Sequence, residues 1–254
     1  MRIITWNVNG IRAVAKKGLF EFISARDPDI LCLQETKAHP DQLTTELLAP
    51  PGRESFWSAA QKPGYSGTAT FVKKPCEGIK YGIGIKKFDS EGRFVITDHG
   101  RFLLYNVYFP NGGSGEERHL FKQDFLRKFK SHLKQVLDSG REVILVGDYN
   151  VAHKDGDVYD PKKLANESGF LPEERQWFGE FLEVGFVDAF RHLHPNAQKR
   201  FTWWSYQDRG RLANRGWRID YICLSKGLAA QLKSCEILDD VEGSDHCPVV
   251  CELD

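Results

Sequence analysis

The sequence lacks the long hydrophobic runs that mark membrane and secreted proteins. No stretch of its 254 residues approaches the roughly 18 consecutive apolar residues that indicate a membrane-spanning helix. The segment from Met1 to Trp6 passes directly into a strand pattern, without the charged and apolar regions of a signal peptide. We therefore expect an intracellular protein with no membrane partner.

Cysteine pairs are also lacking. The six cysteines are scattered with no C-x-x-C spacing, and most lie inside apolar runs, where cysteine behaves as a small hydrophobic residue. We expect free thiols. Cys247 and Cys251 lie beside His246, but two cysteines four residues apart without a second pair make a poor zinc site.

An excess of charge of either sign is absent, since 35 Lys and Arg residues balance 35 Asp and Glu residues. This balance argues against a protein that passively coats nucleic acid. It is compatible with a nuclease, whose metal-binding acids offset the Lys and Arg residues that reach phosphates. Repeats, low-complexity tracts and Pro/Ser-rich linkers are missing as well. The length and composition predict one large α/β domain over residues 1–254, with two small domains as the alternative.

The apolar patterns predict a strand-rich α/β chain. Strand-like runs occupy residues 2–7, 30–35, 68–72, 94–97, 102–108, 143–148, 219–224 and 249–253. A helix is predicted where apolar residues recur every four positions from Phe121 to Leu137, and a second helix should begin at Pro172 and end at Gly185. Residues 50–65, 151–169 and 205–215 are the longest predicted loops, and we expect substrate contacts there.

Two pairs of polar residues stand where predicted strands end. Asn7 and Asn9 are two positions apart, so both side chains leave the same face of the chain, and Asp148 and Asn150 repeat this spacing. Binding sites of α/β sheets commonly lie at such strand ends. The alternative is that each pair only caps a turn.

Further acids and a histidine complete a candidate site. Glu35 follows an apolar, buried strand pattern, so its carboxylate needs a partner or a metal. With Asp245 and the Asn9 amide it would provide the oxygen ligands that suit Mg²⁺ or Mn²⁺. Asp220, at a strand start, is the candidate to orient His246 and to raise its pKa. The alternatives are a structural salt bridge for Glu35 and an ordinary core or surface role for His246.

Eight short motifs occur in order along the chain: W-N-V-N-G (6–10), L-Q-E-T-K (33–37), Y-F-P-N (108–111), G-D-Y-N-V-A-H (147–153), G-F-L-P-E-E-R (169–175), T-W-W-S-Y (202–206), G-W-R-I-D-Y (216–221) and G-S-D-H-C-P (243–248). Together they resemble the exonuclease III family of apurinic/apyrimidinic (AP) endonucleases. A single match would be weak, but their number, order and spacing make coincidence an inadequate explanation.

The resemblance implies a DNase I-like fold, a four-layer α/β sandwich in which two mixed β-sheets pack face to face and are flanked by helices. It implies a hydrolase that uses Mg²⁺, with Mn²⁺ as an alternative, to cut duplex DNA 5′ to abasic sites in base excision repair. It also implies 3′-phosphodiesterase and 3′→5′ exonuclease activities on blocked 3′ ends. A monomer in the cytoplasm or on the nucleoid would fit this family.

The matching motifs imply a role for each site residue. Glu35 would be the principal metal ligand, and Asp148 would activate or position the attacking water. His246, paired with Asp220, would stabilise charge on the phosphate. The other residues near the metal would be Asn9, Asp245, Asn7, Asp148 and Asn150, and the other phosphate contacts Asn7, Tyr108 and Asn111. The pocket for an extruded sugar without a base would be formed by Trp203, Trp217 and Ile219.

Some alternatives stay open, and the chain departs from the family pattern. Tyr108 and Trp204 would also fit an aromatic core. Glu167 stands where many relatives have Asn, and an acid there would repel a phosphate. Asn9 replaces the Asp of some relatives, which removes one anionic ligand. Rival interpretations are a phosphatase or sphingomyelinase on the same scaffold and a silent DNA-binding module.

Overall fold

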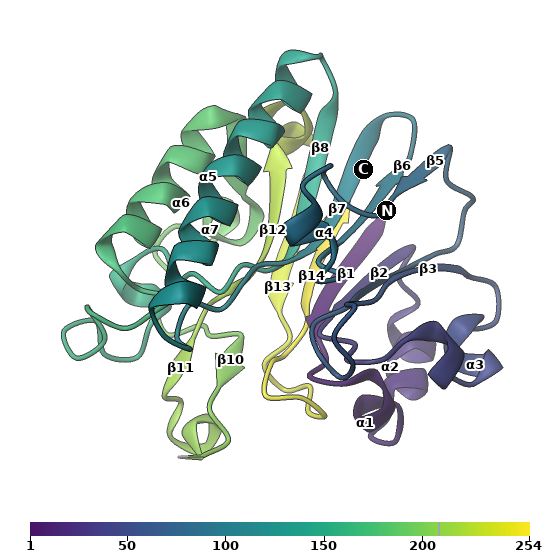
Figure 1. Cartoon of the computed structure of the whole chain (residues 1–254), viewed down its shortest axis with the longest axis horizontal. Helices are drawn as coiled ribbons and strands as arrows, with labels where there is room; N and C mark the ends of the chain where they lie inside the picture. Colours follow the sequence, from purple (N-terminus) through teal and green to yellow (C-terminus); the bar gives the residue numbers. More distant parts are fainter. Residues whose placement is uncertain (208) are drawn as a thin grey trace.

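Two mixed β-sheets of six strands each form the centre of the molecule (Figure 1). The computed structural model describes residues 1–207 and 209–254. In spatial order, the first sheet consists of β13 (Leu232–Ile237), β14 (Val249–Leu253), β1 (Arg2–Asn7), β2 (Ile30–Gln34), β4 (Thr68–Val72) and β3 (Glu54–Ser58). The second consists of β5 (Gly78–Lys80), β6 (Phe94–Asp98), β7 (Phe102–Tyr108), β8 (Glu142–Asp148), β12 (Asp220–Ser225) and β9 (Phe186–Asp188).

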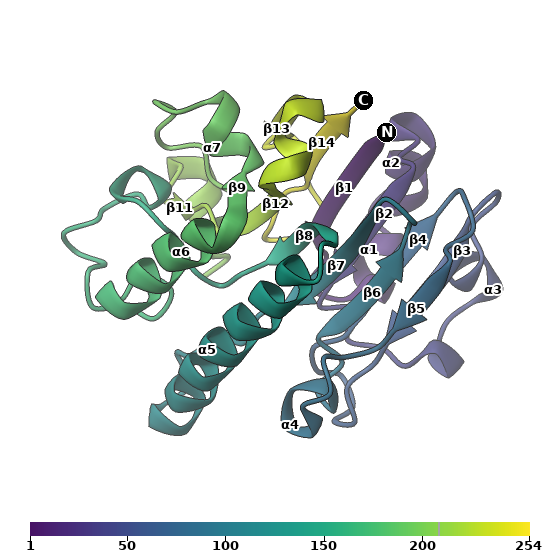
Figure 2. The same cartoon turned by 90° about the horizontal axis from the view of Figure 1, so that it is seen from above.

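Each sheet has one parallel pair of strands at its centre. β1 runs parallel to β2, and β7 runs parallel to β8, whereas the other neighbouring strands of both sheets are antiparallel. A separate ribbon is formed by β10 (Trp203–Trp204) and β11 (Gly216–Trp217). The chain ends lie side by side, where the Met1 amino group donates to the Leu253 carbonyl oxygen at 2.6 Å (Figures 1 and 2).

Helices cover the outer face of each sheet, as Figure 2 shows. The α-helices are α1 (Ile11–Ala15), α2 (Leu19–Arg26), α3 (Thr45–Leu48), α4 (Lys86–Asp89), α5 (Glu116–Asp138), α6 (Pro172–Gly185) and α7 (Ala189–Leu193). Short 3₁₀ helices occupy Pro40–Gln42, Asp155–Asp157, Gly210–Ala213 and Lys226–Gln231. Within residues 1–207 and 209–254, no helix has both the length and the apolar content needed to cross a membrane.

Three hydrophobic cores separate four layers. The core between the sheets includes Cys32 and Val146, which come from β2 and β8. A second core joins α5 and α6 to the outer face of the second sheet, and a third joins α1 and α2 to the outer face of the first. This arrangement confirms the four-layer sandwich implied by the resemblance. The six cysteines are free thiols, and five of them are buried.

The longest predicted elements are present. All eight predicted strands occur, with ends that differ by at most one residue, and α6 begins at Pro172 and ends at Gly185 as predicted. In α5 the apolar stripe packs as expected: Phe125, Phe129 and Leu133 are fully buried. Burial of this stripe against the second sheet stabilises the helix more than the local propensity of its residues does.

The prediction that residues 50–65 form a loop is wrong in part, because β3 lies within them. This strand is at the edge of its sheet and is mostly half-exposed, so its sequence lacks the apolar pattern of a central strand. The other two predicted loops contain only short 3₁₀ helices among their described residues. Short elements, including α1–α4, α7, β5 and β9–β11, were not predicted, because a few residues carry too little periodicity.

Candidate active site

The candidate site lies at the edge where the central parallel strands of both sheets end. Asn7 is the last residue of β1, Tyr108 is the last of β7 and Asp148 is the last of β8. Glu35 directly follows β2. Because parallel neighbours end at the same edge of a sheet, strand periodicity alone brings these side chains to one place.

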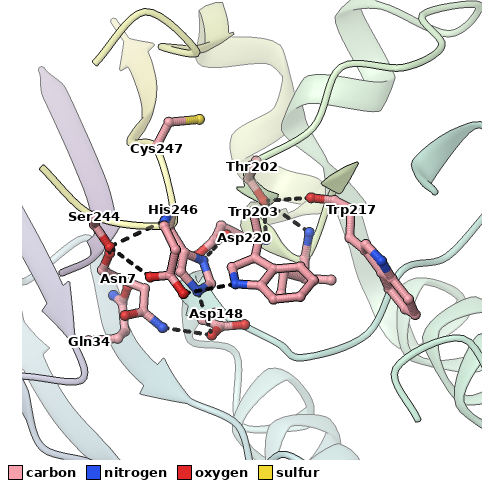
Figure 3. Close-up of polar contacts among 12 residues, drawn as sticks. Asn7, Gln34, Asp148, Thr202, Trp203, Trp217, Asp220, Ser244, His246 and Cys247 are labelled. Carbon is pink, nitrogen blue, oxygen red and sulfur yellow. Dashed lines mark hydrogen bonds and ion pairs between the residues drawn. The ribbon is translucent and has the colours of Figure 1, made fainter. Parts of the chain in front are cut away.

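Asn7 connects the acids of the two sheets. Its buried Nδ2 donates to Glu35 Oε1 at 3.0 Å. The same Nδ2 donates to Asp148 Oδ2 at 2.8 Å (Figure 3). Its Oδ1 accepts a hydrogen bond from the Asn9 backbone N–H at 3.0 Å, and its carbonyl oxygen accepts one from Ser244 Oγ at 2.9 Å. One side-chain amide therefore fixes the distance between carboxylates that belong to different sheets.

Glu35 and Asn9 share one cation, Lys37. The Lys37 ammonium lies 2.8 Å from Glu35 Oε2 and donates to Asn9 Oδ1, and Asn9 Nδ2 donates to Asp245 Oδ1 at 2.9 Å. Asn9, Glu35 and Lys37 all have positive φ, between 46° and 52°, which is uncommon outside glycine and is retained where side chains must be aimed. Burial would raise the pKa of Glu35, but Lys37 and Asn7 outweigh it and lower the pKa, so this carboxylate is ionised.

Asp148 is held by its own loop. The Asn150 backbone N–H donates to Asp148 Oδ1 at 2.8 Å, and Asn150 Nδ2 lies 3.4 Å from Asp148 Oδ2. Asn111 Nδ2 in turn donates to Asn150 Oδ1 at 3.1 Å. At the preceding residue, Gly147, an added Cβ would lie 1.9 Å from the Val107 carbonyl oxygen, so glycine alone lets β8 approach β7 here.

His246 and Asp220 form a buried pair. His246 Nδ1 lies 2.8 Å from Asp220 Oδ2, and Nε2 lies 3.9 Å from Asp148 Oδ2 (Figure 3). Burial alone would lower the pKa of His246, but the charge of Asp220, the hydrogen bond to it and the nearby acids raise the pKa to about 10. Burial, followed by the charge of Asp220, raises the pKa of Asp148 to about 7. A charged imidazolium therefore lies beside a carboxyl group that can exchange a proton near neutral pH.

Tyr108 is an uncharged donor at the edge of the site. The buried Arg93 guanidinium lies over the Tyr108 ring, 5.0 Å from its centroid, and donates to the Tyr108 carbonyl oxygen at 2.9 Å. Burial and the charges of Glu35 and Asp148 raise the pKa of Tyr108 well above its ordinary value. The phenol therefore keeps its proton at neutral pH.

A pocket of about 760 Å³ opens beside these groups. Its aromatic wall comes from the β10–β11 ribbon, where the rings of Trp203 and Trp217 lie 6.3 Å apart in an edge-on arrangement. Trp203 Nε1 donates to Asp245 Oδ2 at 3.1 Å (Figure 3). The predicted site residues that line this pocket are Asn9, Glu35, Tyr108, Asn111, Asp148, Asn150, Trp203, Trp217, Ile219, Asp245 and His246. Trp204 is instead buried in the core between the sheets.

The donor groups fit a divalent metal that prefers oxygen. Glu35, Asp148 and His246 each place one ligand atom within 4.8 Å of the others. A protonated His246 has no free lone pair, so the carboxylates are the ligands that this group offers. Asn7 and Asn150 both direct Nδ2 toward Asp148. The Oδ1 atoms of these two asparagines accept other hydrogen bonds, from the Asn9 backbone N–H and from Asn111 Nδ2.

Sequence reasoning missed a polar connection between the sheets beneath the site. Gln34 Nε2 donates to Asn106 Oδ1 at 2.7 Å and to Thr5 Oγ1 at 2.9 Å, and Asn106 Nδ2 donates to Thr70 Oγ1 at 3.1 Å. All four residues are fully buried. Their only signal in the sequence is a polar residue inside an apolar strand.

Thr202 is a second residue that sequence reasoning missed. Its Oγ1 accepts hydrogen bonds from the backbone N–H groups of Ile219 and Asp220, at 3.0 and 3.1 Å (Figure 3). These bonds fix the start of β12, from which Asp220 reaches His246. The motif T-W-W-S-Y contains Thr202 but gives no hint of this contact.

The fold and the site define a class, the metal-using hydrolases in which two β-sheets share one active site. The chain belongs to the Endonuclease/Exonuclease/phosphatase family, which matches residues 4–246. It is a nuclease of the exonuclease III and AP endonuclease type within that family.

Individual relatives agree with this assignment. The chain is 43% identical over 250 residues to an exodeoxyribonuclease of Bacillus subtilis, covering 98% of each chain. It is 39% identical over 260 residues to a DNA-(apurinic or apyrimidinic site) endonuclease of Dictyostelium discoideum, covering all of this chain and 71% of that protein. Its fold matches the structure of a 3′-5′ exonuclease from Neisseria meningitidis with a TM-score of 0.92, 29% identity and complete coverage of both chains.

Proposed function

We propose that the protein is a Mg²⁺-dependent DNA-repair endonuclease that hydrolyses the phosphodiester bond 5′ to an abasic site in duplex DNA. We also infer 3′-phosphodiesterase and 3′→5′ exonuclease activities on blocked 3′ ends. One observation carries the proposal: an aromatic-walled pocket opens directly beside the Asp148–His246 pair. The names of the relatives support DNA as the substrate. The chain would act as an intracellular, single-domain monomer.

The metal site is assigned to the acids of both sheets. Glu35 would be the principal ligand, near Asp245, Asp148 and the Asn9 amide, and the set suits Mg²⁺ with Mn²⁺ as a substitute. When bound, the ion supplies positive charge that offsets the negative charge of the phosphate under attack. Asn7 would hold two of these carboxylates at a fixed separation.

The proton and the developing charge are assigned to two neighbouring residues, Asp148 and His246. Asp148 would accept a proton from the attacking water, because Asn7 and Asn150 hold its carboxylate at the wall of the pocket. Water oxygen then bonds to phosphorus as the bond to the 3′ oxygen of the preceding nucleotide breaks. His246 Nε2–H would donate to a phosphate oxygen, while Asp220 keeps the ring charged. Tyr108 and Asn111 would add neutral donors.

Selection of damaged sites is assigned to the pocket. Trp203, Trp217 and Ile219 form an apolar wall against which a sugar without a base can lie. Unpairing an intact nucleotide costs more free energy than extruding an abasic one, and the pocket would also have to hold the base. Exclusion of intact nucleotides from the pocket therefore favours the lesion, and no hydrogen bonds to base edges are needed.

The first experiment is cleavage of a labelled duplex that carries one stable abasic-site analogue, with Mg²⁺ and with chelator, beside an undamaged duplex of the same sequence. We expect metal-dependent incision immediately 5′ to the lesion. Glu35→Gln should lower the rate by orders of magnitude and raise the metal concentration needed. Hydrolysis of phosphoinositide without incision of damaged DNA, by folded protein, would overturn the proposal.

A further inference from the structure

A buried ion pair lies outside the catalytic groups, where α5 and α6 meet beneath residues 151–169. Lys122 Nζ of α5 is 2.5 Å from Glu174 Oε1 in the first turn of α6, and the two side chains are 1% and 0% exposed. Desolvation of two charges largely offsets their attraction, so such a pair is weak evidence of a stabilising role. Its hydrogen bonds indicate what it does.

The pair binds both ends of the loop of residues 151–169. Lys122 Nζ donates to the carbonyl oxygen of Asn150, the residue immediately before the loop, at 2.8 Å. Glu174 Oε2 accepts from the backbone N–H of Gly169, the last residue of the loop, at 2.6 Å, and from that of Leu171 at 3.1 Å. The pair of charges therefore reinforces the base of the loop, which the hydrogen bond from the Ala152 N–H to the Gly169 carbonyl oxygen at 2.7 Å also closes.

This loop forms one wall of the candidate active-site pocket. Leu164, Glu167 and Gly169 are among its lining residues, and Leu164 packs in one cluster with Trp203 and Trp217 of the aromatic ribbon. At Gly169, whose φ is +100°, an added Cβ would lie 3.1 Å from the Asn150 carbonyl oxygen and 3.2 Å from the Trp217 ring. The loop end is thus already in close contact with the aromatic wall, and any shift of Gly169 changes the width of the pocket.

We propose that Lys122 and Glu174 are positioning residues that set the width of the lesion pocket and thereby the preference for abasic over intact DNA, an inference that rests on the proposed function. Neither side chain is part of the pocket wall formed by the described residues, so both act through the backbone of Asn150 and Gly169. Release of these two contacts lets the backbone at Gly169 shift away from Trp217, while Val158 and Tyr159 stay paired with Trp217 and Gly216. A wider pocket admits a nucleotide that still carries its base.

The test compares Lys122→Met, which keeps an apolar stem but removes the charge, with a matched control, Lys130→Met. Lys130 pairs with Glu180 and so joins the same two helices further along, but this pair is partly exposed and does not contact the loop. Loop release is measured by trypsin cleavage at the exposed Lys162 and Lys163. Preference is measured as the rate of abasic-site incision divided by the rate of digestion of undamaged duplex, with KM and kcat determined separately.

For Lys122→Met we expect trypsin cleavage in the loop to be about tenfold faster. We expect the preference ratio to fall about tenfold, because a displacement of the pocket wall by about 1 Å changes a reaction rate by this much or more. The Lys130→Met protein should match the wild type in both measurements. If Lys122→Met does not fold, the double variant Lys122→Met/Glu174→Gln, which leaves no unpaired charge, decides the question by the same two measurements.

Unchanged cleavage in the loop, an unchanged preference ratio, or equal effects in Lys130→Met would each overturn the inference. The trypsin measurement needs no DNA, so it remains informative even if the wild type fails to incise abasic sites. In that case the proposed function would be wrong, and faster loop cleavage would still establish that Lys122 and Glu174 hold the loop.

Discussion

Replacing Asp148 by Asn should make the metal-free protein more stable at neutral and alkaline pH while it removes the nuclease activity. Burial, followed by the charge of Asp220, raises the pKa of Asp148 from 3.8 to about 7. The native state therefore holds this proton more tightly than the unfolded chain does. Ionisation of Asp148 therefore lowers the free energy of unfolding. This loss of stability is absent below pH 3.8, grows as the pH rises and is complete above pH 7.

The size of this effect follows from the shift. A difference of roughly 3 pKa units at about 1.36 kcal/mol each gives a cost of about 4 kcal/mol above pH 7. Asn carries no charge and removes this cost. It also has one acceptor oxygen in place of two, so the N–H donors of Asn7 and Asn150 lose part of their bonding, which costs about 1–3 kcal/mol. The net gain should be about 1–3 kcal/mol at pH 8 and should reverse to a loss near pH 4.

The assay is urea denaturation in chelator at pH 5 and pH 8, followed by tryptophan fluorescence. Asp157→Asn is the matched control, because Asp157 is also fully buried. Burial would raise the pKa of Asp157, but Arg218 and Arg191 outweigh it and lower the pKa. Its charge therefore contributes stability that is complete above pH 3.8 and lost in stronger acid, so its replacement should destabilise the protein equally at pH 5 and pH 8. A difference between wild type and Asp148→Asn that does not change with pH would refute the reasoning.

Three further substitutions test other parts of the site. The Lys37→Met variant should bind Mn²⁺ several-fold more tightly than the wild type, because the Lys37 ammonium competes with a metal for Glu35. Electron paramagnetic resonance measures the affinity, and weaker binding by the variant would contradict this. Glu167→Asn should lower KM for duplex DNA by a few-fold at low salt, with the difference disappearing as salt screens the charge. Asn106→Leu should lower the free energy of unfolding by about 1–3 kcal/mol, because Gln34 and Thr70 each lose a buried hydrogen bond; a denaturation midpoint equal to wild type would exclude this role.

The sequence predicts best those features that depend on one segment. The period of β1 and β8 correctly predicts that Asn7 and Asp148 lie at strand ends, and the apolar stripe of α5 correctly predicts its packing on a sheet. The motif resemblance correctly implies the four layers, which periodicity alone does not give. The pairing of Asp220 with His246 was inferred from residue types, and the 2.8 Å contact agrees with it.

Other features that depend on two distant segments were not predictable. Lys122 follows the apolar Phe121 in a helix whose pattern predicts exposure for charged residues, and its burial depends on Glu174, which is distant in the chain. The contact of Gln34 with Asn106 depends on how the two sheets face each other. The positive φ of Glu35 and Lys37 has no signature in residue types, since neither is glycine or asparagine. The assigned roles of the site residues stay predictions until the substitutions above are measured.

The pairing of β1 with β14 governs when this nuclease can first become active during its synthesis. β14 is the last strand of the first sheet to be synthesised, yet it lies between β13 and β1 in that sheet. Asp245 and His246 precede it directly, and the His246 carbonyl oxygen accepts a hydrogen bond from the Trp6 indole near the start of the chain. A growing chain therefore already contains Glu35 and Asp148 but cannot place the imidazole beside them. The active site is therefore complete only after β14 has paired with β1.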